Sequence, residues 1–267
     1  MTPARPVVFF LSDYGLADEF VGVVHAVLLR LAPDVVVVDL THGIPAFDVP
    51  AGAEALTRAV PHLGPGVVLA VVDPGVGSAR RGAAVRAGDG RWFVAPDNGL
   101  VVPAAEACGG VEAALELRKP GDVPATFDGR DVFAPAAAAL ASGAPPASVG
   151  DGLDPGSLVR LSRLETVRRE EDGSVVLRVP VAWVDKFGNV QLGAAERDGP
   201  PPGAGTVTVR VAGTSLGARR VHAFSELGDG ELGLLADANG RLAIVVREGS
   251  AASATRLVAG GVVELVW

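Results

Sequence analysis

Three apolar stretches in the first half of the chain each lead into an aspartate. Residues 7–11, 35–38 and 67–72 have the near-continuous apolar composition of strands that are buried on both faces of a sheet. The carboxyl ends of parallel strands meet at one edge, where open α/β sheets bind their ligands. We therefore expect a ligand crevice near the aspartates that follow these stretches: Asp13, Asp39 and Asp73.

The segments between these strands have the spacing of helices. Apolar residues recur at helical intervals over residues 20–31, with Asp18 as a candidate N-cap, and residues 51–60 continue the alternation. A further strand is predicted at 92–95 and a further helix at 131–141. Alternation of this kind predicts an α/β domain with a mostly parallel central sheet.

The pattern changes after residue 143. Residues 143–156 are rich in Pro, Gly, Ser and Asp, which is typical of a linker. Beyond them, short apolar stretches alternate with turns and no helix is predicted, which favours a small all-β barrel. We predict an N-terminal α/β domain over residues 1–155 and a C-terminal β-barrel domain over residues 156–267.

Charge and cysteine content narrow the possible partners. The formal net charge is −8, so the chain lacks the basic footprint expected for binding nucleic acid or an anionic membrane. No apolar run approaches the roughly 20 residues that span a bilayer. Cys108 is the only cysteine, which excludes an intramolecular disulfide and suits a reducing compartment. We expect a cytoplasmic protein with a small-molecule partner.

Common cofactor and metal motifs are absent from the sequence. No G-x-G-x-x-G follows the first strand, and neither a P-loop nor an H-E-x-x-H motif occurs. The histidines are scattered: His25 and His62 fall in helical segments and suggest structural roles, whereas His42 follows a strand and is equally compatible with a site. The sequence predicts no metal site.

Three polar segments carry candidate chemistry. A Pro-Gly-Val-Gly turn separates Asp73 from Arg80 and can bring both into one crevice. Asp128 precedes the helix predicted at 131–141 and is free to face a site, whereas Asp131 is a candidate cap. The polar turn at 185–189 is either an ordinary hairpin turn or a ligand contact.

Taken together, these segments resemble one family. The motifs Phe-Leu-Ser-Asp-Tyr-Gly, Asp-Leu-Thr-His, Val-Asp-Pro-Gly-Val-Gly, Ala-Pro-Asp-Asn-Gly and Asp-Lys-Phe-Gly-Asn occur in order along nearly the whole chain. The chain looks like an S-adenosyl-L-methionine (SAM) hydrolase, or SAM hydroxide adenosyltransferase, a relative of fluorinase and chlorinase. The resemblance implies a homotrimer with sites between subunits, and hydrolysis of SAM to adenosine and L-methionine without a cofactor or metal.

The resemblance also implies roles for individual residues. Asp13 matches the carboxylate that holds the ribose hydroxyls, and Phe47 matches an aromatic wall of the pocket. Asp73 and Arg80 match two members of a water-binding Asp-Arg-His set. In the C-terminal domain the matching positions contact the methionine amino group or the adenine, or lie beside those contacts: Asp185, Phe187, Asn189, Arg247, Glu248, Gly249 and Ala251.

Two positions bear on the choice of reaction. Asp128 stands where the family pattern has histidine, so we consider two roles for it: it accepts the proton of the attacking water, or it only orients Arg80. Asp73 stands where the halogenating relatives have tyrosine, and a carboxylate repels a halide. Water is therefore favoured over a halide-dependent adenosyltransferase, and a nonenzymatic SAM or adenosine sensor is the third alternative.

Overall fold

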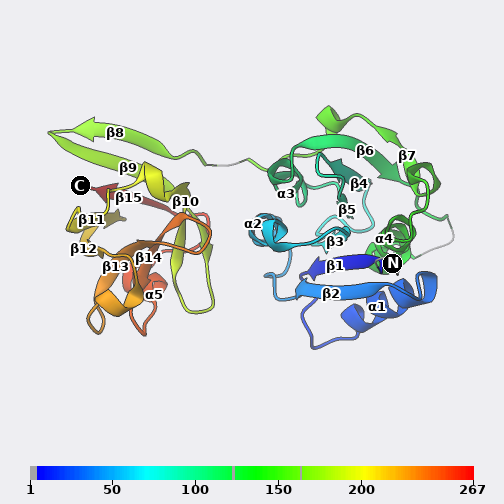
Figure 1. Ribbon diagram of the computed structural model, residues 1–267, viewed down its shortest axis with the longest axis horizontal. Coiled ribbons are helices and arrows are strands. Elements are labelled where there is room, and N and C mark those ends of the chain that lie inside the picture. The colour runs from blue at the N-terminus through cyan, green and yellow to red at the C-terminus, as the bar shows by residue number, and fades with distance from the viewer. Residues whose placement is uncertain (1–4, 122–123, 163) are drawn as a thin grey trace. The chain divides into compact units, whose positions relative to one another are not determined.

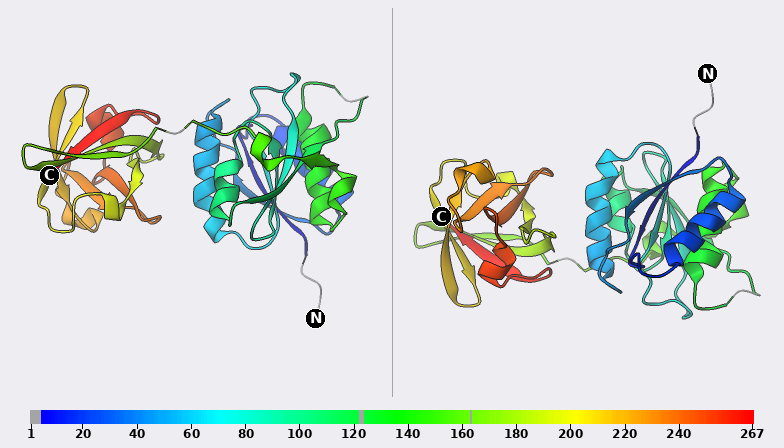
Figure 2. Two further views of the ribbon diagram at one scale, coloured as in Figure 1. Left: turned by 90° about the horizontal axis from the view of Figure 1, so that it is seen from above. Right: turned by 90° about the horizontal axis from the view of Figure 1, so that it is seen from below.

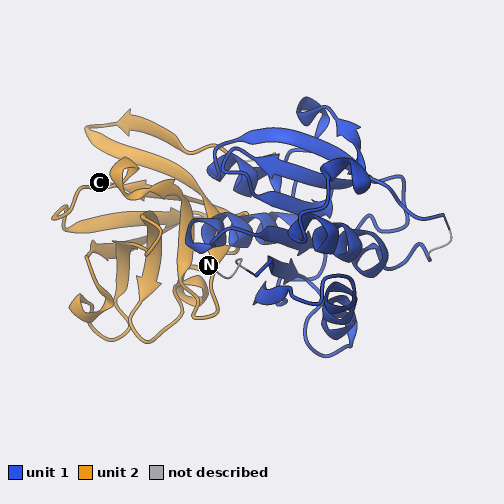
Figure 3. Cartoon of the chain, turned by 45° about the vertical axis from the view of Figure 1, so that its right-hand side comes forward, with its two compact units in different colours: residues 1–161 blue, residues 162–267 orange. Residues whose placement is uncertain are grey.

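The computed structural model describes residues 5–121, 124–162 and 164–267 (Figure 1). The chain forms two compact units, Met1–Leu161 and Ser162–Trp267 (Figure 3). The boundary predicted between residues 155 and 156 lies a few residues before this division. Residues 143–156 do not form a free linker, because they include β7 (Gly150–Leu153), which pairs with a strand of the first unit.

Unit 1 is built on a seven-stranded mixed sheet in the order β2-β1-β3-β5-β4-β6-β7. Neighbours from β2 to β5 pair in parallel, and the remaining neighbours are antiparallel. The antiparallel half was not predicted, because β4 and β5 are joined by a tight turn and not by a helix. The strands not yet given are β1 (Val7–Ser12), β2 (Val36–Thr41), β3 (Val67–Val71), β4 (Gly82–Ala87), β5 (Trp92–Pro96) and β6 (Val111–Leu117).

Helices cover both faces of this sheet. Figure 2 shows α2 (Val49–Ala59) and α3 (Val102–Ala107) on one face, and α1 (Phe20–Leu31) and α4 (Ala134–Ala141) on the other. Asp18 does not cap α1, whose N-cap position is Glu19 and has no side-chain cap bond. The predicted α/β domain is confirmed, with its main core between the sheet and the α1–α4 layer.

The segment before α4 departs from a regular helix. A π-helical turn, Gly129–Phe133, precedes α4, and no side chain caps either segment. Asp131 is therefore not a cap; its carboxylate accepts hydrogen bonds from Arg130 at 2.7 Å. Such π turns are frequent at functional sites, because the wider turn redirects side chains.

Unit 2 is a closed barrel of seven strands, as predicted. Pairing of β9 with β10 closes the ring, and β8 (Val167–Glu171) extends β9 outside it. The barrel strands are β9 (Ser174–Val184), β10 (Val190–Ala195), β11 (Thr206–Val211), β12 (Thr214–Arg220), β13 (Leu232–Ala236), β14 (Arg241–Val246) and β15 (Val262–Val266). The expectation of no helix is wrong: α5 (Ala251–Thr255) follows β14, and it is too short to produce a helical pattern in the sequence.

Short 3-10 turns complete the fold at Val60–His62, Pro146–Ser148, Pro155–Ser157, Glu196–Asp198 and Phe224–Glu226. Among the described residues, no helix is both long and apolar enough to cross a membrane.

The barrel core gives a direct test of this packing. Leu265 is fully buried in β15, whereas Val258 is largely exposed. We expect Leu265→Ala to lower the free energy of unfolding by about 2–5 kcal/mol, because it leaves a cavity. Val258→Ala, the matched control, is expected to change it by less than about 0.5 kcal/mol. Urea denaturation followed by circular dichroism measures both, and equal losses would contradict the assigned core.

Candidate active site

The candidate site of unit 1 lies at the carboxyl ends of β1 and β3. These strands are parallel neighbours with Ser12 opposite Val71, so Asp13 and Asp73 emerge at one edge of the sheet. The Asp13 amide donates to the Val71 carbonyl at 3.3 Å, which continues the pairing into the loops. Asp39 does not join them, because it lies within β2 and faces two histidines.

Asp13 fixes the loop that carries Phe47. Its Oδ2 accepts a hydrogen bond from the Phe47 amide at 2.9 Å. Phe47 has a φ of 67°, a left-handed conformation that is uncommon for a bulky residue, and it is 70% exposed. An exposed aromatic ring on a strained backbone is a feature of ligand-binding loops.

Arg80 is held between the two carboxylates that sequence analysis placed beside it. Its Nη2 donates to Asp73 Oδ2 at 2.6 Å and to Asp128 Oδ2 at 2.8 Å. The guanidinium lies over the Phe133 ring, 5.3 Å from its centroid, and all three charged side chains are at most 10% exposed. Asp73 and Asp128 therefore flank Arg80 in the structure.

Lys119, whose side chain is 40% exposed, adds a second cation at the edge of this cluster and was not anticipated. Its Nζ donates to Asp128 Oδ1 at 2.6 Å, so both oxygens of Asp128 are paired with cations. A signal was available in the sequence, because Lys119 is one of only two lysines in a chain that otherwise uses arginine. Its distance of nine residues from Asp128 across a loop gave no reason to pair them.

Two buried polar atoms of this cluster have no hydrogen-bond partner among the described residues. They are Asp73 Oδ1, an acceptor, and Arg80 Nε, a donor. Leaving a buried polar group unpaired costs about 1–3 kcal/mol, so such atoms in a charged site point to a polar ligand. A water molecule both donates and accepts hydrogen bonds, so it has the chemistry to pair with an acceptor such as Asp73 Oδ1 and with a donor such as Arg80 Nε.

The protonation behaviour of Asp73 follows from its surroundings. Burial raises the pKa of Asp73, the charge of Asp128 raises it further, and Arg80 and the Gly75 amide oppose the increase. A carboxylate with a raised pKa is a stronger base than an ordinary aspartate, which suits it to accept a proton.

Tyr14 joins the site although sequence analysis gave it no role. Burial raises the pKa of Tyr14, and the nearby charges of Asp13, Asp73 and Asp128 raise it further, so the phenol stays protonated. Its ring packs with Phe20 and Phe127 at centroid distances of 5.7 Å each, forming an aromatic wall beside the carboxylates. Tyr14 was present in the Phe-Leu-Ser-Asp-Tyr-Gly motif, but no charge pattern singled it out.

A second group of the sequence-predicted residues comes together in unit 2. Asp185 closes the turn after β9: its Oδ1 accepts from the Phe187 and Asn189 amides at 2.9 and 3.0 Å, and its Oδ2 accepts from Asn189 Nδ2 at 2.9 Å. The hairpin-turn role that the sequence left open is thus present. Phe187, at the tip, is 66% exposed.

The segment from Arg247 to Ala251 lies beside this turn. The Gly188 carbonyl accepts from the Ala252 amide at 2.9 Å, and a Cβ on Gly188 would lie 2.1 Å from Ser250 Oγ. Glu248 adopts a φ of 52°, and Gly249 bridges back to Val246. The predicted adenine-facing residues Arg247, Glu248, Gly249 and Ala251 therefore adjoin Asn189 within the same barrel.

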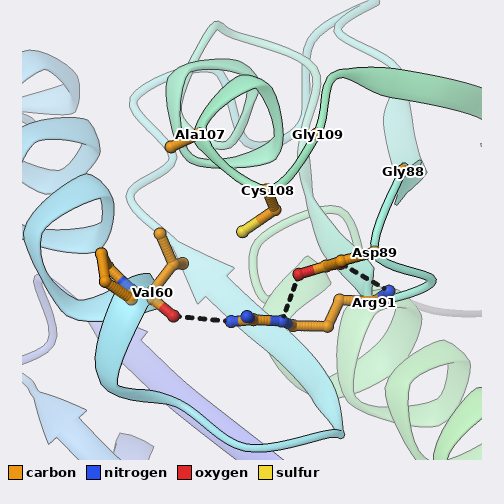
Figure 4. A pocket seen from close by; sticks show the side chains of 8 residues that line it. Val60, Gly88, Asp89, Arg91, Ala107, Cys108 and Gly109 are labelled. Carbon is orange, nitrogen blue, oxygen red and sulfur yellow. Dashed lines mark hydrogen bonds and ion pairs between the residues drawn. The ribbon is translucent and has the colours of Figure 1, made fainter.

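One cavity of unit 1 lies away from these residues. It has a volume of about 450 Å³ and is lined by Val60, Asp89, Arg91 and Cys108 among others (Figure 4). Arg91 precedes β5, so this cavity lies at the amino end of that strand, opposite the candidate site. Arg91 is already bonded to Asp89 and to the Val60 carbonyl, and burial raises the pKa of Cys108, which makes its thiol unreactive.

Comparison with known proteins agrees with this architecture. Models of the SAM hydroxide adenosyltransferase N-terminal and C-terminal domains match residues 8–150 and 179–264. The chain therefore belongs to the SAM hydroxide adenosyltransferase family. It is 48% identical to an (R)-S-adenosyl-L-methionine hydrolase of Salinispora tropica, with 92% of each chain covered.

A fluorinase and a solved crystal structure are also similar to this chain. A fluorinase of Nocardia brasiliensis is 32% identical over 60% of this chain and 62% of its own length. The crystal structure of an uncharacterized conserved protein from Thermotoga maritima has a TM-score of 0.87 and 34% identity, covering 97% of this chain and 99% of its own.

The close approach of Gly129 to Tyr14 provides a test of the site. A Cβ on Gly129 would lie 2.0 Å from the Tyr14 hydroxyl oxygen, while the Gly129 backbone conformation itself is open to alanine. We expect Gly129→Ala to destabilise the protein, and less so in a Tyr14→Phe background, with a coupling energy of about 1–2 kcal/mol. Denaturation of the single and double variants measures this coupling, and simple additivity would contradict the contact.

Proposed function

We propose that this protein hydrolyses S-adenosyl-L-methionine to adenosine and L-methionine. The observation that carries the proposal is that two buried atoms of this charged cluster, the acceptor Asp73 Oδ1 and the donor Arg80 Nε, have no hydrogen-bond partner among the described residues. These are the two kinds of atom with which a water molecule forms hydrogen bonds. Family membership and the high identity to a SAM hydrolase support the choice of substrate.

In the proposed reaction the water oxygen attacks ribose C5′ in line with the C5′–S bond. The new C–O bond forms as the C–S bond breaks. The electron pair of the C–S bond leaves with the sulfur, so the positively charged sulfonium becomes a neutral thioether. Such a leaving group needs no general acid, and the reaction as proposed uses no cofactor. Positioning and exclusion of competing solvent are then the main contributions of the enzyme.

The contacts of Asp128 favour one of the two hypotheses for its role. Both of its oxygens are paired with cations, whereas Asp73 has a buried free oxygen and a raised pKa. Asp73 therefore accepts the proton of the attacking water, and Asp128 acts as a positioning residue that holds Arg80 in place. Lys119 compensates the charge that aspartate brings to a position where the family pattern has histidine.

The remaining residues bind the substrate in this proposal. Asp13 receives the two ribose hydroxyls, a natural bidentate partner for a carboxylate, and Phe47 covers the pocket. In unit 2 the methionine amino group and the adenine are bound by the turn at 185–189 and the adjoining segment at 247–251. We further propose a cytoplasmic homotrimer in which unit 1 of one subunit meets unit 2 of the next.

A halide-dependent transfer and a nonenzymatic sensor are the two alternatives. The Asp73 carboxylate would repel a halide at the position proposed for water. A sensor has no use for a carboxylate with a raised pKa whose Oδ1 has no hydrogen-bond partner among the described residues. Neither alternative gains support from a contact in the site.

The assignment of roles is tested with SAM and paired variants. We expect adenosine and methionine to form at the same rate with and without chloride. Asp73→Asn should lower kcat by at least about 100-fold, because it removes the proton acceptor. Asp128→Asn should lower it less and should keep the acid limb of the pH profile, in which the rate falls as Asp73 is protonated with decreasing pH.

Asp172→Asn, at the exposed β8–β9 turn, is the matched control and should leave the rate unchanged. A larger loss in Asp128→Asn than in Asp73→Asn would reverse the two roles. A chlorinated nucleoside would move the assignment to halide transfer. Intact SAM that still raises the melting temperature would indicate a sensor.

Light scattering tests the proposed assembly. We expect the mass of three chains of 27.0 kDa each. Because a shared site needs two subunits, mixing an Asp73→Asn chain with an Asp185→Ala chain should restore part of the activity that each variant lacks alone. A monomeric mass, or mixing without recovery, would contradict sites between subunits.

A further inference from the structure

The structure brings together two histidines and an aspartate that sequence analysis treated as unrelated. His25 lies on α1, Asp39 within β2, and His42 just after β2. His25 Nε2 lies 2.8 Å from Asp39 Oδ1, and His42 Nε2 lies 3.0 Å from the same oxygen. One donor atom from each residue falls within 4.8 Å of the others.

The buried member of this cluster has an unsatisfied nitrogen. The His42 side chain is 4% exposed, and its Nε2 lies 3.0 Å from Asp39 Oδ1 as an ion pair without a hydrogen bond of good geometry to any described residue. A buried imidazole nitrogen beside a carboxylate, without a hydrogen bond between them, is costly. A cation placed between the two would satisfy both.

The surroundings hold the donors in place. Ser12 Oγ lies 2.8 Å from His42 Nδ1, an outer hydrogen bond of the kind that fixes the ring orientation of a metal-bound histidine. Both imidazoles pack on the buried Phe10 ring, at centroid distances of 4.6 Å for His42 and 6.0 Å for His25. The cluster is therefore built on a helix, a strand and a packed aromatic ring.

The chemistry of the donors selects the class of ion. Two imidazoles with one carboxylate suit zinc and similar divalent transition metals, whereas calcium and magnesium prefer oxygen ligands. Ligands of a tetrahedral zinc ion with bonds of about 2.0–2.1 Å lie about 3.3 Å apart, so the observed separations need only a small adjustment. His25 and Asp39 are partly exposed, which leaves room for water as a further ligand.

We propose that His25, Asp39 and His42 form a binding site for a divalent transition-metal ion of the zinc class. The site is separate from the reaction proposed above and does not depend on it. The ion joins α1 to the end of β2, and through Ser12 it reaches the residue that precedes Asp13. The His42 carbonyl also accepts from the Gly15 amide at 2.7 Å, so the ion would clamp the loop that carries Asp13.

The test uses the full-length protein stripped of metal by a chelator and titrated with Zn²⁺ in a calorimeter. We expect one ion per chain, and an affinity at least about 100-fold lower in His25→Gln or Asp39→Asn, since even outer-sphere changes cost 10–100-fold. His62→Gln and His222→Gln, which change the other two histidines, are the matched controls and should bind as the parent does.

Two further measurements make the result independent of folding in any one variant. Co²⁺ bound to the unmodified protein should give the visible spectrum of nitrogen and oxygen ligation without a thiolate band, which excludes Cys108. Anomalous diffraction at the zinc edge should place the ion between His25, Asp39 and His42. Binding of less than one ion per chain, undiminished binding in His25→Gln, or an ion located elsewhere would overturn the proposal.

Discussion

The site of unit 1 depends on one nitrogen atom, Nη2 of Arg80, which is shared by two buried carboxylates. Without this nitrogen between them, Asp73 and Asp128 would face each other as like charges, which repel strongly in a buried site. Lys119 supplies the second positive charge, so the formal charges of the four side chains cancel. Removing one member of a buried ion pair typically costs about 3–5 kcal/mol, which ties these residues together as a unit.

The two carboxylates of this cluster also differ in their hydrogen-bond partners. Both Asp128 oxygens are paired with cations, whereas Asp73 has one buried oxygen without a hydrogen-bond partner among the described residues, which supports the proposed division of roles. Two adjacent residues at the end of β1 contact different sites. Ser12 is hydrogen-bonded to His42, and the next residue, Asp13, accepts a hydrogen bond from the Phe47 amide. Adjacent residues in a strand point to opposite sides, so one strand end can connect the candidate metal site to the candidate active site.

Much of the architecture could be predicted from local patterns. Apolar stretches ending at Asp13 and Asp73 predicted the parallel strands, and short strands separated by turns predicted the barrel. The antiparallel half of the sheet was missed because β4 and β5 are joined by a tight turn without a helical pattern, and because β4, β6 and β7 were not predicted as strands. The short α5 and the π-helical turn before α4 were missed because neither is long enough to show a period. The N-cap predicted at Asp18 is wrong. The N-cap position of α1 is the next residue, Glu19, and no side chain forms a cap hydrogen bond there.

The sequence alone determined the class of fold, because hydrophobic periodicity is a local property. The order of its motifs carried the resemblance to the family, and that resemblance implied that Asp128 lies beside Asp73 and Arg80. Only the tertiary structure decided which oxygen of which aspartate is free, that Lys119 neutralises Asp128, and that His25 meets Asp39 and His42. Those facts depend on side chains that are distant in sequence but are brought within hydrogen-bond reach by strand pairing and helix packing. Charge balance in a buried site is a property of that three-dimensional arrangement, and no spacing along the chain encodes it.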